Sequence, residues 1–129
     1  MTGQRTTGIR VALVIDVREH PQGDRIFLAD IDLGDGVPHQ VVFGGVRPLS
    51  KGDLVAAAPP GARLRDGSKL RSRRFRGERS YGMLCSTDEL GWTTGGPDEV
   101  ALLRLDARPG ASLDEVDDPA AWLLDPANF

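Results

Sequence analysis

The stretch Arg74–Gly91, which reads RFRGERSYGMLCSTDELG, decides how the fold of this chain is interpreted. It overlaps a basic window, residues 63–79, in which eight cationic residues are opposed only by Asp66 and Glu78. The window therefore carries a net charge of +6, and the remaining residues carry −9 of the chain's net −3. Because the positive charge is collected in one segment, an acidic chain can still present a local phosphate-binding surface.

The composition of the 129-residue chain is that of one globular domain, with 40% hydrophobic and 27% charged residues. No apolar run reaches the roughly 20 residues of a membrane-spanning helix, and the residues after Met1 lack the apolar region of a signal peptide. We therefore expect a cytoplasmic protein without membrane association. The single cysteine, Cys85, excludes an internal disulfide, and one cysteine with two distant histidines predicts neither a metal site nor a cofactor.

Hydrophobic alternation predicts a series of short β-strands separated by glycine-rich turns. In the first strand, Ile9 to Val17, the odd-numbered residues are apolar and are expected on one buried face. Further strands are expected at 27–33, 37–43, 54–58, from Leu70 onward, at 80–85 and at 99–105, with short helical turns within 46–52, 86–89 and 118–124. Five or six short strands with little helix indicate a small closed or partly open all-β barrel.

The deciding stretch also carries a recognisable motif, formed by Arg76, Gly77, Ser80, Gly82, Met83 and Leu84. With Arg74 in place of a lysine and Phe75 in place of a leucine, it resembles the Lys-Leu-Arg-Gly-x-x-Ser-x-Gly-Met-Leu pattern of the EMAP-II-like tRNA-binding domain. That family includes free-standing tRNA-binding proteins, the C-terminal domain of methionyl-tRNA synthetases and the N-terminal domain of the phenylalanyl-tRNA synthetase β subunit. Upstream, His20–Ile26 resembles the family's His-Pro-Asn-Ala-Asp-Lys-Leu and differs at Gln22 and Gly23.

The resemblance implies an all-β fold, a five-stranded Greek-key OB-fold barrel with short helical turns and a C-terminal extension. Residues 1–8 are expected to form a flexible lead, and residues 9–91 the OB-fold tRNA-binding domain. Residues 92–129 would complete the barrel or form the interface of a homodimer, with Trp92 and Trp122 among the apolar residues available for it.

The function implied is structure-selective, largely sequence-independent binding of tRNA. Cations that neutralise phosphates give salt-dependent affinity without base information, and aromatic side chains can stack on an exposed base. The candidate RNA-binding residues are Lys69, Arg71, Arg73, Arg74, Phe75, Arg76, Arg79, Ser80, Tyr81 and Met83. Alternation along one strand would place residues 71, 73 and 75 on one face and residues 72, 74 and 76 on the other, so that only part of the cations contact RNA at once.

Plainer interpretations and other function classes stay open beside this one. A run of charges is most often a solvated surface, and Met83 is typical of a core. One alternative is a protein-interaction module, derived from a tRNA-binding domain, that docks on an aminoacyl-tRNA synthetase or another tRNA-using enzyme. An enzyme acting on a small molecule or an aminoacyl-tRNA has the least support, because the sequence shows no paired acid–base motif, phosphate loop or metal set.

Overall fold

A computed structural model describes residues 6–21, 26–44, 49–64, 66–85, 102–104 and 107–114 of the chain. Within these residues the secondary structure is all β, with no helix. The strands are β1 (Arg10–Glu19), β2 (Ile26–Asp32), β3 (Pro38–Gly44), β4 (Leu54–Ala58), β5 (Arg73–Phe75), β6 (Glu78–Ser80), β7 (Met83–Leu84) and β8 (Leu102–Leu103). None of the described segments is a helix long and apolar enough to cross a membrane.

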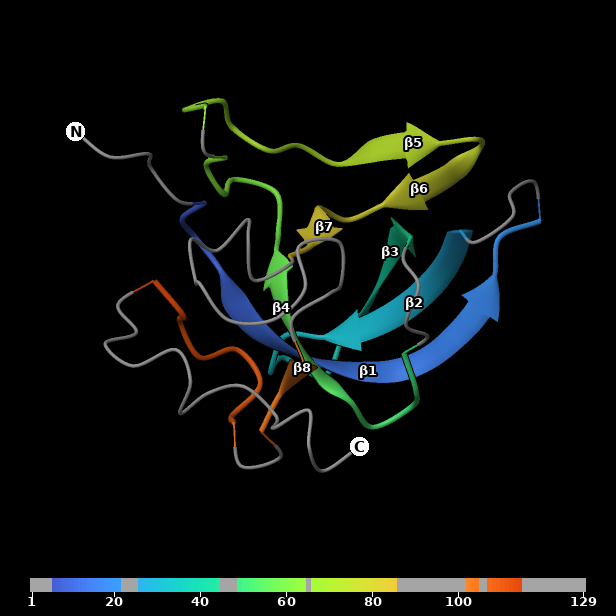
Figure 1. The fold of residues 1–129 in the computed structure, drawn as a ribbon, viewed down its shortest axis with the longest axis horizontal. Coiled ribbons are helices and arrows are strands. Elements are labelled where there is room, and N and C mark those ends of the chain that lie inside the picture. Colours follow the sequence, from blue (N-terminus) through green and yellow to red (C-terminus); the bar gives the residue numbers. More distant parts are fainter. Residues whose placement is uncertain are drawn as a thin grey trace.

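The main sheet is antiparallel and strongly curled, with the order β3-β2-β1-β4-β7 and with β8 also paired to β4 (Figure 1). Its two ends are joined by the segment that follows β6. The Tyr81 N–H donates to the Gln40 carbonyl on β3 (2.7 Å), and two residues later β7 pairs with β4. This arrangement confirms the expected all-β, OB-like barrel.

The single strand expected at residues 80–85 is split in two. β6 ends at Ser80 and β7 begins at Met83, because Gly82 has a φ of +79° and turns the chain between them. The expected strand at 54–58 is confirmed, whereas the strand expected from Leu70 begins only at Arg73. A late strand is present at Leu102–Leu103 within the expected 99–105.

The prediction that β1 buries one face only was wrong for the first half of the strand, where both faces are covered, whereas Asp16 and Glu19 farther along are exposed. Val11 packs into one cluster, and Ala12 and Val14 pack into another on the opposite side of the strand. A register shift against β2 between Val14 and Asp16 is the mark of a β-bulge. After this bulge Val17 packs against the same cluster as Val14, although strict alternation would place residues 14 and 17 on opposite faces.

The interior cluster fills the barrel and the outer cluster covers the far side of β1 and β4. The interior cluster comprises Ala12, Val14, Ala29, Ile31, Val41, Phe43, Leu49, Val55, Ala57, Leu84 and Leu102. The outer cluster comprises Ile9, Val11, Leu54, Ala56, Ala58, Ala62, Leu70, Cys85, Leu103 and Leu113. β4 is therefore buried along its whole length.

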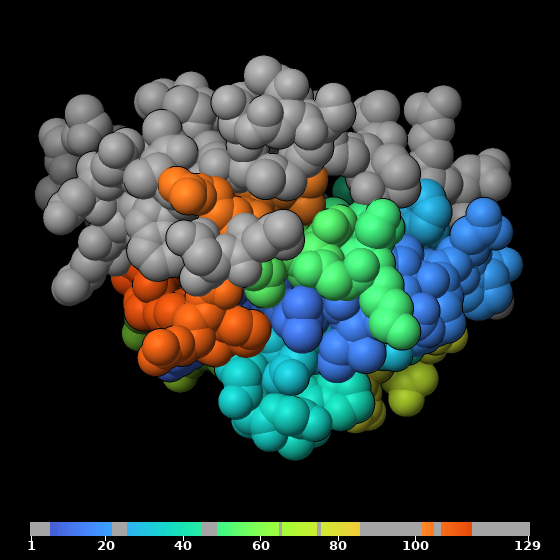
Figure 2. Space-filling view, turned by 90° about the horizontal axis from the view of Figure 1, so that it is seen from below, coloured from blue at the N-terminus to red at the C-terminus, as the bar shows by residue number. Residues whose placement is uncertain are grey.

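Part of the C-terminal region, residues 107–114, runs beside the start of β1. The Gly110 N–H donates to the Val11 carbonyl (2.7 Å), and the Leu113 N–H donates to the Ile9 carbonyl (2.9 Å). Seen from below in Figure 2, this segment (orange) lies against β1 (blue) and the turn between β2 and β3 (cyan). Together with the outer cluster, this segment covers the outer surface where the start of β1 pairs with β4.

Several sequence-based expectations fall on residues outside the described ranges. These are residues 22–25 of the His20 motif, residues 46–48 of the helical turn expected within 46–52, the helical turns expected at 86–89 and 118–124, and the tryptophans Trp92 and Trp122. Residues 49–52, which the structure describes, form no helix. Of the His20 motif, the structure describes His20 itself, which is buried and whose main-chain N–H donates to the Ile26 carbonyl (3.0 Å).

Candidate nucleic-acid interface

The basic window forms a hairpin that stands apart from the main sheet. β5 and β6 pair only with each other, in the register Arg73↔Ser80, Arg74↔Arg79 and Phe75↔Glu78. Figure 1 shows this hairpin beyond the ends of β2 and β3. The alternation expected over residues 71–76 therefore holds only for the three residues of β5, since residues 71 and 72 precede it and Arg76 lies in the turn.

Arg74 and Arg79 lie directly opposite each other on one face of the hairpin, and both are exposed. Like charges in directly opposed positions of an antiparallel pair are destabilising. Neither guanidinium forms an ion pair with any residue that the structure describes. An anion placed between the two side chains would relieve this repulsion, so the pair has the electrostatics of a phosphate-binding site.

The hairpin turn presents a further arginine at its tip. Arg76 has a φ of 50° and Gly77 a φ of 89°, and positive φ at both central residues is the requirement of a type I′ turn. Arg76 is the single non-glycine residue with a positive φ in the described ranges. Asparagine, aspartate and glycine suit this position better, so arginine costs about 1 kcal/mol here. Such strain is characteristic of functional sites.

The cations that precede the hairpin lie on an exposed loop. Arg63 and Lys69 are joined by an isolated β-bridge, and Arg71 follows on the path to β5. Asp66 sits between them, and the Ser68 hydroxyl donates to its carboxylate (2.6 Å). This hydrogen bond, with a second from the Ser68 N–H, lowers the pKa of Asp66, so one negative charge persists inside the basic window.

Two of the expected contact residues instead hold the barrel together. Ser80 is 4% exposed, and its hydroxyl donates to the Gly82 carbonyl (2.8 Å) and accepts from the Val42 N–H (2.9 Å). Met83 packs against the outer cluster. Since their polar and apolar groups are already engaged, we leave both residues out of the proposed RNA contacts.

Tyr81 is partly engaged as well. Its ring stacks on the ring of His39 from β3, with centroids 4.0 Å apart and an interplanar angle of 12°. The tyrosine also packs against the interior cluster. The expected stacking of a base on Tyr81 would therefore involve the pair of rings, a partner that the sequence pattern did not reveal. Phe75 belongs to β5 by its backbone, and its side chain lies outside the described part.

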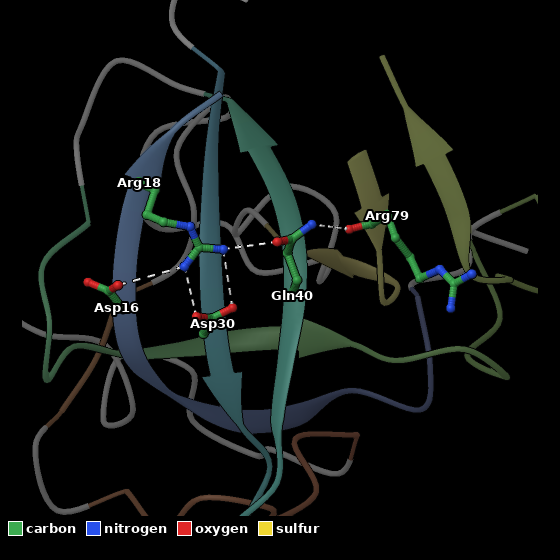
Figure 3. Close-up of polar contacts among 5 residues, drawn as sticks. All are labelled: Asp16, Arg18, Asp30, Gln40 and Arg79. Carbon is green, nitrogen blue, oxygen red and sulfur yellow. Dashed lines mark hydrogen bonds and ion pairs between the residues drawn. The ribbon is translucent and has the colours of Figure 1, made fainter. Parts of the chain in front are cut away.

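A polar network that was not predicted from the sequence crosses the outer surface of β1, β2 and β3 (Figure 3). Arg18 donates to the two oxygens of Asp30 (2.8 and 3.4 Å) and to Oε1 of Gln40 (2.9 Å). Asp16 lies 3.7 Å from the same guanidinium. With two carboxylates around one arginine, this surface carries no excess of positive charge, in contrast to the hairpin.

Comparison with known proteins adds independent evidence. The family model described as "Putative tRNA binding domain" matches residues 9–112. The phenylalanine–tRNA ligase beta subunit of Salinibacter ruber is 39% identical over 114 residues, which cover 81% of this chain and 13% of the relative. The same subunit of Neisseria meningitidis serogroup B is 38% identical over 108 residues, covering 84% and 14%. That of Halalkalibacterium halodurans is 39% identical over 88 residues, covering 68% and 11%. The chain thus spans about an eighth of the length of these relatives.

Proposed function

Because this chain belongs to the putative tRNA-binding domain family, we propose that it binds tRNA through the β5–β6 hairpin. The observation that carries the proposal is the exposed pair Arg74 and Arg79, directly opposed and without a described counter-ion. Arg73, on the opposite face of the same hairpin, and Arg76 at its tip add further positive charge to the hairpin.

The recognition is of shape and backbone and is largely independent of base sequence. Arginine side chains bind phosphates through charge and paired N–H donors, and neither carries sequence information. Aromatic residues make up only 5% of the chain, so stacking on bases contributes at most locally, at Tyr81 with His39. Affinity is therefore expected to fall steeply as the salt concentration rises.

The biological setting that we propose is that of an accessory domain. The relatives named above are subunits of a ligase for tRNA, and the chain corresponds to a small part of them. We propose that it acts in the cytoplasm without catalysis of its own, that it presents tRNA to a synthetase or another tRNA-using enzyme, and that residues 92–129 support a homodimer.

Binding selectivity tests the proposal. The full chain is titrated with total tRNA, with single-stranded RNA and with duplex DNA over a series of salt concentrations, beside the variant Arg73→Glu/Arg76→Glu. We expect tRNA to bind more tightly than the other two polyanions at every salt concentration, and the charge reversal to abolish the difference. Equal affinity for all three polyanions would contradict the proposal.

A second candidate function is docking on a protein partner. The outer surface of β1–β3 favours it, because Arg18 is balanced there by Asp16 and Asp30 and the surface offers hydrogen bonds without a net positive charge. A purified synthetase that binds the chain with the same affinity in low and high salt, together with weak tRNA binding, would favour this candidate over the first.

A further inference from the structure

The orientation of the basic hairpin depends on a few hydrogen bonds at its base, one of which the Val42 N–H of β3 donates to the Ser80 hydroxyl of β6 (2.9 Å). β5 and β6 form their own two-stranded sheet, and a two-stranded hairpin is at best marginally stable in water when isolated. At its base, Gln40 of β3 binds the chain twice. The Gln40 side-chain Nε2 donates to the Arg79 carbonyl (2.9 Å), and the Gln40 main-chain carbonyl accepts from the Tyr81 N–H (2.7 Å).

The direction of the Gln40 amide is determined by its neighbours. Arg18 has only donors, so the amide atom that faces its guanidinium must be the oxygen Oε1. The NH₂ group is then directed at the Arg79 carbonyl, which can only accept. Every donor in this chain of hydrogen bonds meets an acceptor, and the reverse orientation of the amide would lose both bonds.

Arg18 is held in turn by Asp30. The carboxylate receives two N–H groups of the guanidinium, and this hydrogen bonding raises the pKa of Arg18 above its ordinary value. The network therefore runs from β1 through β2 and β3 to β6, and Figure 3 shows the Arg79 side chain leaving its far end, pointing away from Gln40.

We propose that Gln40 is a positioning residue for the RNA-binding arginines, an inference that rests on the proposed tRNA binding. Its amide fixes the main chain of Arg79, and Arg74 is paired directly opposite. The two guanidinium groups therefore leave the hairpin in one direction, ready for adjacent phosphates. Without the amide the hairpin keeps its charge and the bonds of Ser80 and Tyr81 to β3, but it loses the bond that holds Arg79.

Two substitutions separate the effect of the hairpin's orientation from the effect of its charge. Gln40→Met keeps the length of the side chain and the net charge, and it removes the two hydrogen bonds of the side-chain amide, with Arg18 and with the Arg79 carbonyl. Gln40→Glu combined with Asp30→Asn keeps an acceptor for Arg18 and the net charge of the network, but sets an acceptor against the Arg79 carbonyl. Leu113→Ala, in the outer cluster, serves as a destabilised control on the side of the barrel covered by the C-terminal segment.

Hydrogen exchange of the amides of residues 73–80 measures how well ordered the hairpin is. Titrations with tRNA over a salt series measure the affinity and its dependence on salt. We expect the hairpin amides to exchange faster in both Gln40 variants. We also expect both variants to bind tRNA about tenfold more weakly, which is the loss expected when one arginine no longer contacts a phosphate. The slope of log affinity against log salt should fall by about 0.7 to 0.9, the value for one phosphate contact. Leu113→Ala should lower the melting temperature and keep the slope of the wild type.

Wild-type affinity and slope in Gln40→Met would overturn the positioning role, and so would unchanged exchange in the hairpin. If the wild-type chain itself failed to bind tRNA, the proposed function would fall and the RNA part of this inference with it. Faster hairpin exchange in Gln40→Met would in that case still support the anchoring by Gln40.

Discussion

Gly82 lies so close to Ala58 that a Cβ atom at residue 82 would overlap the Ala58 carbonyl oxygen. The approach occurs where β7 begins its pairing with β4, next to the hydrogen bond from Tyr81 that joins this segment to β3. The glycine of the family motif therefore closes the barrel, and the same turn fixes where the basic hairpin ends.

Gly82→Ala is expected to destabilise the protein severely. The new methyl group must displace the β4 backbone, and the residue has a φ of +79° that L-residues rarely adopt. Together these effects cost about 3 kcal/mol or more, measured as the free energy of unfolding in urea. Gly36→Ala is the matched control, because its φ is +76° and no atom lies within 4 Å of its Cβ position. A loss no larger than that of the control would refute barrel closure by Gly82.

Ser80→Ala tests whether this serine is structural. The substitution leaves the part-buried Val42 N–H without its partner, which costs about 1 kcal/mol of unfolding free energy. Because the Ser80–Val42 bond also joins β6 to β3, the affinity of the folded protein for tRNA should fall by no more than in Gln40→Met, about tenfold. A variant of normal stability with strongly weakened tRNA binding would instead identify Ser80 as a direct RNA contact. Ser72→Ala, an exposed serine, provides the comparison.

Arg76→Asn should stabilise the hairpin and weaken RNA binding at the same time. Asn-Gly is the preferred sequence of a type I′ turn, so the substitution relieves the positive φ and should add about 0.5 to 1 kcal/mol of stability. The loss of one cation should lower the salt slope of tRNA binding by about 0.7 to 0.9. Calorimetric melting and filter binding measure the two effects. An unchanged slope would show that Arg76 does not contact phosphate.

Ser68 should control the ionisation of Asp66. In the folded protein the hydroxyl and N–H of Ser68 lower the pKa of Asp66 below its ordinary value of 3.8. The stabilisation is therefore complete above pH 3.8 and is lost as the pH falls through the lower folded value. In Ser68→Ala the Asp66 pKa should move up toward 3.8, as followed by carboxyl NMR. Equal titration curves for the two proteins would contradict this assignment.

The strands and the motif could be predicted from the sequence because both are local. The run of small apolar residues at 54–58 lies between turn residues, and β4 has these limits in the structure. The motif from Arg76 to Leu84 indicated the family, which the comparison with known proteins shows. The barrel followed from several such local patterns.

The errors and omissions concern contacts between distant parts of the chain. β1 was expected to have one solvated face, but the outer cluster, with Ala62, Leu70 and Leu113 from distant parts of the chain, covers the first half of that face. The break at Gly82 depends on the backbone of Ala58. The hydrogen bonds of Gln40 join strands that only the fold brings together, and a glutamine on an exposed strand face carries no sequence signal of its own.

The central claim is that the opposed arginines of the hairpin bind the phosphates of tRNA. Its most direct test is the salt slope of tRNA binding for Arg74→Gln/Arg79→Gln. The matched control, Arg10→Gln/Arg108→Gln, removes the same charge from exposed arginines at the start of β1 and in the 107–114 segment. We predict that the slope falls by about 1.4 to 1.8 for the hairpin variant and stays at the wild-type value for the control. Equal slopes for the two variants would contradict the claim.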